Sequence, residues 1–198
     1  MGCLFGAKLS QVAEVTLVGH WPAQLAALRE RGLQLIQPDG RSHTLRLTAT
    51  DNPATAAPAD LALILVKSYQ TPQAAEMAQQ LLAPNGVALT LQNGLGNLEQ
   101  LTAVLGPHRA NLGITSEGAA LLALGVVHHA GTGHTTIANA ADTAVLPQRI
   151  VELFQAAGFA TSLATDAEGL VWGKLAINAG INPLTAVFGA LYGAVCGL

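Results

Sequence analysis

Two apolar segments separated by a helical pattern constrain the fold of this chain more than any other feature. Residues 61–66 (LALILV) and 87–91 (VALTL) lack the polar alternation of a half-solvated strand. Such runs are typical of strands that are buried on both faces of a parallel sheet. Residues 72–82 lie between them and predict a helix, which is the usual connection between two parallel strands. The expected fold class is therefore α/β.

The same alternation continues along the chain. Further helices are expected at 2–11, 22–31, 98–105 and 147–157, and further strands at 14–18, 112–115 and 161–163. Residues 33–36 and 44–47 flank the turn PDGR and predict a hairpin, and residues 126–129 and 134–137 are expected to form an antiparallel pair. This order of elements predicts a Rossmann-type, doubly wound parallel sheet over residues 1–165. Asp166 is expected to be the N-cap of the helix that follows.

Composition narrows the function classes. The 198 residues have a formal net charge of -3, and only 11% are charged, without a basic cluster. Nucleic acid is not an expected partner, because neutralising phosphates requires Lys and Arg concentrated on one surface. The apolar segment 183–198 is shorter than the roughly 20 residues of a membrane span, and no secretory signal opens the chain, so a cytoplasmic protein without a membrane partner is expected.

The histidines and cysteines do not predict a metal site. His128, His129 and His134 have no acidic or cysteine neighbour close in sequence, so they are interpreted as solvated or hydrogen-bonded side chains. Cys3 and Cys196 form no CxxC pair and are interpreted as small buried residues.

The amino-terminal glycines indicate a dinucleotide. Gly2 and Gly6 have the spacing of the last two glycines of GxGxxGxxxG, although a closely packed helix would also use them. In this interpretation the first strand and two leading glycines of the pattern precede Met1 and are absent. The segment VGHW, in which His20 follows the strand 14–18, has no carboxylate for a ribose 2′-hydroxyl, which favours NADP over NAD.

Two loops follow the apolar strands. Lys67 comes directly after residues 61–66, and Asn93 and Gly94 come after residues 87–91. Each has an ordinary alternative, a surface lysine in one case and a turn in the other. Both are nevertheless expected at the carboxyl edge of the sheet, where open α/β sheets bind ligands.

A polar stripe interrupts the apolar segment WGKLAINAGINPLTAV. Lys174, Asn178 and Asn182 are four residues apart, so a helix places all three on one face. A snorkelling Lys and a capping Asn near Pro183 would explain Asn182 but not Asn178. Such a donor-rich stripe is not expected in an apolar core.

These motifs together resemble the ketopantoate reductase family, the 2-dehydropantoate 2-reductases. The motifs that carry the resemblance are GxxxGAKL, LVKSYQT, LQNGLGN, GITSEGA and WGKLAINAGINPLTA, in this order. The resemblance implies a Rossmann domain at 1–165 and the start of an all-helical substrate and dimerisation domain at 166–198, with truncation at both ends. It also implies NADPH-dependent reduction of a 2-keto acid to a 2-hydroxy acid in pantothenate synthesis, by a homodimer in the full-length form.

The resemblance assigns roles to individual residues. Lys174 matches the proton donor, and Asn178, Asn182 and Asn93 match residues that contact the substrate. The positions that match cofactor contacts are Gly2, Lys67, Asn93 and Ala119. His20 stands where the family commonly has a phosphate-binding Arg, and Leu191 and Tyr192 depart from its usual Pro and Asn. Two alternatives stay open, a β-hydroxyacid dehydrogenase of another type and a truncated remnant without activity.

Overall fold

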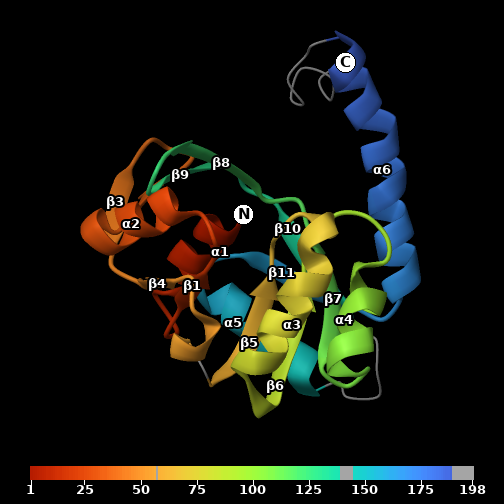
Figure 1. The fold of residues 1–198 in the computed structure, drawn as a ribbon. Helices are drawn as coiled ribbons and strands as arrows, with labels where there is room; N and C mark the ends of the chain where they lie inside the picture. The colour runs from red at the N-terminus through yellow and green to blue at the C-terminus, as the bar shows by residue number, and fades with distance from the viewer. Residues whose placement is uncertain (57, 139–144, 189–198) are drawn as a thin grey trace.

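The computed structural model describes residues 1–56, 58–138 and 145–188 (Figure 1). The helices are α1 Gly2–Leu9, α2 Pro22–Arg31, α3 Thr71–Leu81, α4 Asn97–Leu105, α5 Val145–Ala156 and α6 Ala167–Phe188, with short 3-10 turns at Pro53–Thr55 and Ser68–Gln70. The strands are β1 Thr16–Val18, β2 Leu33–Ile36, β3 Ser42–Leu45, β4 Thr48–Thr50, β5 Ala59–Ile64, β6 Leu82–Thr90, β7 Ala110–Thr115, β8 Gly118–Ala123, β9 Val126–Gly131, β10 His134–Ala138 and β11 Ala160–Ala164.

The largest sheet has five strands in the order β11-β10-β7-β6-β5. β5, β6 and β7 are parallel, while β10 is antiparallel to β7 and parallel to β11. One face packs on α3 and α4 through a core around Ile64, Ala88 and Leu101, and the other packs on α1 and α5 around Leu89 and Phe154. Helices on both faces explain the continuous apolar runs of residues 61–66 and 87–91, and they confirm the expected α/β, Rossmann-like fold.

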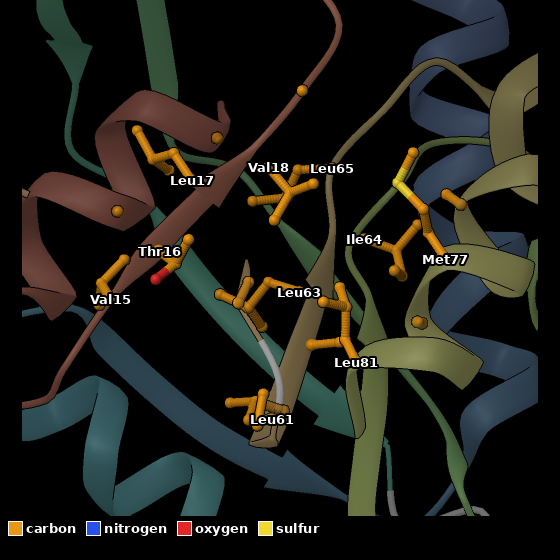
Figure 2. A pocket seen from close by; sticks show the side chains of 18 of the residues that line it. Val15, Thr16, Leu17, Val18, Leu61, Leu63, Ile64, Leu65, Met77 and Leu81 are labelled. Atoms are coloured by element: carbon orange, nitrogen blue, oxygen red, sulfur yellow. The ribbon is translucent and has the colours of Figure 1, made fainter. Parts of the chain in front are cut away.

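The strand predicted at 14–18 does not join this sheet. β1 pairs in parallel with β4, and the two form a separate two-stranded sheet. Gly6 lets α1 pack closely on β1, because a Cβ at this position would lie 2.7 Å from Cδ2 of Leu17. The doubly wound arrangement is therefore interrupted between β1 and β5, which lie in separate sheets and face each other across apolar side chains (Figure 2).

The third sheet corrects the expected pairing of residues 126–129 with 134–137. β9 pairs with β8 and β2 in a four-stranded sheet of order β3-β2-β9-β8, whereas β10 belongs to the five-stranded sheet. A tight turn at Gly125, whose φ is +78°, joins β8 to β9, so the partner of β9 precedes it in the chain. The hairpin of β2 and β3 is confirmed, with its second strand two residues earlier than expected.

Helix α1 takes part in two hydrophobic cores. Phe5 and Leu9 belong to the core beneath the five-stranded sheet, where the ring of Phe5 stacks on Phe159 with centroids 4.5 Å apart. Leu4 and Ala7 belong to the core between α2 and the four-stranded sheet. The two sheets are thus connected through opposite faces of one short helix.

Helix α6 follows the last strand and extends away from the sheets (Figure 1). The carboxylate of Asp166 accepts a hydrogen bond of 2.8 Å from the backbone N–H of Gly169, which confirms the expected N-cap. Large apolar side chains on α6 are exposed, with Trp172 at 53% and Ile177 at 57%. Within the described ranges, no helix is both long enough and apolar enough to cross a membrane.

Candidate active site

The carboxyl ends of β5, β6 and β7 bring the two predicted loops together. Lys67 follows β5 and Asn93 follows β6, and both side chains are exposed at this edge. The Ser68 hydroxyl donates a 3.0 Å hydrogen bond to the carbonyl oxygen of Asn93 and so joins the loops. The edge of the sheet was correctly predicted for both residues, because parallel neighbours end on the same side.

A buried polar network fixes the Asn93 loop from below. The Gln92 side chain accepts hydrogen bonds from the hydroxyls of Thr71 and Thr90 and donates one to the carbonyl oxygen of Val66. The Asn97 amide donates to the carbonyl oxygen of Asn93 at 3.2 Å. Because these buried groups are mutually satisfied, they hold the loop backbone in one conformation.

Lys174 reaches the same edge of the sheet from α6. Its ammonium donates a hydrogen bond to the carbonyl oxygen of Thr115, the last residue of β7. Partial burial lowers the pKa of Lys174 from its usual value. Asn178 lies one turn further along α6 and is half-buried, while the side chain of Asn182 lies outside the part of the structure that is described.

The start of α1 forms the remaining side of the candidate site. A Cβ at Gly2 would meet no atom within 4 Å, so the backbone is open there. Burial lowers the pKa of the Met1 amine; Cys3 opposes this effect, and the positive charge of Lys67 adds to it. At the end of β1, His20 Nε2 lies 3.3 Å from the side-chain nitrogen of Gln70. Ala119, on β8, packs against the core that includes Leu4 of α1.

The family model described as "Ketopantoate reductase PanE/ApbA" matches residues 1–142. The chain belongs to the ketopantoate reductase family. A 2-dehydropantoate 2-reductase of Halobacterium salinarum is 38% identical over 192 residues, covering 94% of this chain and 62% of the relative. A second, of Pyrococcus horikoshii, is 32% identical over 197 residues, covering 98% of this chain and 63% of the relative. The chain thus spans about three-fifths of the length of these curated relatives.

Solved structures of ketopantoate reductases share this fold. The 2-dehydropantoate 2-reductase of Geobacter metallireducens has a TM-score of 0.84 and 28% identity, over 94% of this chain and 62% of that one. A ternary structure of D-mandelate dehydrogenase with NADH and anilino(oxo)acetate has a TM-score of 0.87 at 21% identity, over 94% of this chain and 61% of that one. At that identity the second likeness establishes the fold only.

Sequence reasoning did not predict the buried hydrogen-bonded pair of Glu117 and His129 in this ketopantoate reductase-family chain. His129 Nε2 lies 2.5 Å from Glu117 Oε2, and each side chain is 2% exposed. The motif GITSEGA contains Glu117, but its partner is on the next strand and not adjacent in sequence. His134 instead lies 2.7 Å from the Ser162 hydroxyl, so the interpretation as a hydrogen-bonded side chain is confirmed for both histidines.

Proposed function

We propose that this chain is the nucleotide-binding part of a reductase that converts 2-dehydropantoate to pantoate with NADPH. The observation that carries the proposal is the Lys174 ammonium, which meets the sheet at the edge where the Lys67 and Asn93 loops converge. We also propose that residues 1–165 form this domain and that α6 begins a helical second domain over residues 166–198. The exposed apolar side chains of α6 support that division.

The residues at the sheet edge fit an anionic dinucleotide. Gly2 leaves room for a phosphate beside the first N–H groups of α1, and Lys67 adds positive charge there. No carboxylate occupies residues 18–21 at the end of β1, which favours NADPH over NADH. In this proposal Gly2, Lys67, Asn93 and Ala119 hold the cofactor, which supplies the hydride when bound.

The chain's own groups would orient the ketone and donate a proton to its oxygen. Asn178, Asn182 and Asn93 would hydrogen-bond the 2-keto acid as uncharged groups, so they do not compete as acids. Lys174 would approach the ketone oxygen, stabilise the negative charge that forms there and donate a proton to it. Its lowered pKa supports this role, because a proton is released more easily from a partly buried ammonium.

The test replaces Lys174 and measures reduction of 2-dehydropantoate by NADPH. We expect Lys174→Ala to lower kcat by a factor on the order of 10² or more, since a positioned general acid usually contributes that much. In the native chain kcat should fall as pH rises through a pKa below the usual lysine value of 10.5, because only the protonated side chain can donate.

Lys174→Arg is the matched control. It keeps the positive charge, but guanidinium is a very poor acid, so kcat should stay low and the alkaline loss should disappear. NADPH affinity, measured by fluorescence titration, should be unchanged in both variants. Near-normal turnover of Lys174→Ala would contradict the proton-donor role. If the chain bound NADPH but reduced a keto acid other than 2-dehydropantoate, the result would favour a β-hydroxyacid dehydrogenase of another type. If the chain did not bind NADPH, the result would favour a truncated remnant without activity.

A further inference from the structure

The segment of residues 115–117 connects the five-stranded sheet to the four-stranded sheet. Thr115 is the last residue of β7, and Gly118 is the first residue of β8. The carbonyl oxygen of Thr115 accepts the hydrogen bond from Lys174, so the position of this peptide group determines where the ammonium lies. The contacts that fix residues 115–117 therefore bear directly on the placement of Lys174.

Hydroxyl and backbone groups tie the first two residues of the segment to β10. The hydroxyls of Thr115 and Thr135 lie 2.9 Å apart. The backbone N–H of Ser116 donates a 3.0 Å hydrogen bond to the carbonyl oxygen of His134, and the Ser116 hydroxyl accepts one of 2.8 Å from the N–H of the same residue. The segment is thus fixed on the side of the five-stranded sheet.

The side chain of Glu117 fixes the segment to the other sheet. Its Oε2 atom lies 2.5 Å from Nε2 of His129 on β9, and each side chain is 2% exposed. The nearby cation is Lys8 of α1, whose pKa is lowered by burial and raised by the negative charge of Glu117. The Lys8 ammonium donates its hydrogen bond to the carbonyl oxygen of Gly158 instead, at 2.8 Å. Among the described residues, His129 is therefore the partner that orients the Glu117 carboxylate.

A displacement of Glu117 would be transmitted to Thr115. The backbone N–H of Glu117 donates a 3.2 Å hydrogen bond to the Thr115 hydroxyl, so the two residues move together. The close approach of Gly133, where a Cβ would lie 2.5 Å from the carbonyl oxygen of Ser116, leaves no room for the segment to shift toward that side. A buried hydrogen bond fixes direction as well as distance, which an apolar contact does not.

We propose that Glu117 and His129 are positioning residues, which hold the carbonyl group of Thr115 at the point where it receives the Lys174 ammonium. They do not touch the reacting atoms, because they act through the backbone of residues 115–117. This inference rests on the proposed function, since it concerns the alignment of Lys174 with the ketone. Alignment matters there because a displacement of about 1 Å can slow an enzymatic reaction by roughly 100-fold.

The first measurement is the pKa of Lys174, obtained by NMR titration of isotope-labelled lysine side chains, with Lys174→Arg to assign the signal. In the native chain we expect a pKa below 10.5, because burial disfavours the charged form. The test variant is Glu117→Leu with His129→Leu, which leaves no buried polar group unpaired and should therefore fold. In this double variant we expect the pKa of Lys174 to rise toward 10.5, because the ammonium is no longer held at the sheet and becomes more hydrated.

The second measurement is reduction of 2-dehydropantoate by NADPH in the same double variant. We expect kcat to fall about tenfold, because the proton donor is misplaced. The KM for NADPH should stay within a factor of about two, since the pair acts on the proton donor and not on the nucleotide. Glu117→Gln keeps a side chain that can still hydrogen-bond with Nε2 of His129, so it should restore most of kcat and the native pKa of Lys174.

Leu28→Ala is the control for a general loss of stability. Leu28 is 3% exposed on α2, outside the segment and its partners, so kcat and the pKa of Lys174 should be unchanged. A native pKa of Lys174 and a native kcat in the double variant would overturn the proposal, as would equal changes in Leu28→Ala. A native chain that fails to reduce 2-dehydropantoate would contradict the proposed function, whereas the titration of Lys174 would still decide the positioning role.

Discussion

The buried hydrogen-bonded pair of Glu117 and His129 gives a residue-scale test of the structure. Both side chains are 2% exposed, and Nδ1 of His129 has no hydrogen-bond partner among the described atoms. We expect Glu117→Ala to lower the free energy of unfolding by about 2 kcal/mol, because it leaves the imidazole buried without its hydrogen-bond partner. Urea unfolding measures the loss, and the exposed Glu152→Ala, which should cost less than about 0.5 kcal/mol, is the control.

Replacing both partners shows whether the stability lost in Glu117→Ala comes from leaving a buried polar group unpaired. The double variant Glu117→Leu with His129→Leu should recover much of the lost stability, because no polar group then remains unpaired. A double variant less stable than Glu117→Ala would contradict a simple hydrogen-bonded pair.

At this scale the sequence predicted the helical stripe of Lys174 and Asn178, since a fixed spacing defines a helix face. It did not predict Glu117 with His129, because a contact between strands depends on their register.

The short connection between β9 and β10 depends on Gly133. A Cβ at this position would lie 2.5 Å from the carbonyl oxygen of Ser116 and 2.6 Å from the nitrogen of Glu117, both of which are backbone atoms. We expect Gly133→Ala to lower the free energy of unfolding by about 3 kcal/mol, because neither atom can move without disturbing β7 and β8. Denaturant unfolding measures the change.

Gly131→Ala is the matched control for that variant. Gly131 is two residues away, and a Cβ there would meet no atom within 4 Å. Its effect should stay within about 0.5 kcal/mol. If the two variants lost equal stability, the loss would come from the removal of glycine itself and not from the close approach to β7 and β8.

The elements that the sequence predicted are those with strong apolar periodicity. β5, the apolar part of β6 and the helices between strands were recognised because burial on both faces leaves a continuous pattern. β4 (TAT) and β8 (GAALLA) were missed, since one is very short and the other lacks the β-branched residues typical of strands. The missed β8 in turn caused the wrong partner to be assigned to β9.

At the scale of the whole molecule, the sequence predicted those parts of the candidate site whose position follows from the order and direction of the strands. Parallel strands fixed the edge at which the Lys67 and Asn93 loops meet, and that placement is confirmed. The division of the sheet between β1 and β5 was not predicted, because periodicity identifies a strand without showing which edges are paired. The roles of Lys174, Asn93, Asn178 and Asn182 stay predictions until turnover is measured.

Helix α1 has only 8 residues, yet it belongs to two cores, and this decides how the molecule melts. A segment shared by two cores forces them to unfold together, whereas weakening it on one side lets each unfold at its own temperature. We expect Phe5→Ala to lower the ratio of van't Hoff to calorimetric enthalpy and to split the heat-capacity peak. Phe154→Ala removes an equally buried ring from the same core, but from α5, which contributes no described residue to the core between α2 and the four-stranded sheet. That variant should melt at a lower temperature in a single peak, so thermal cooperativity in this chain is a property of α1.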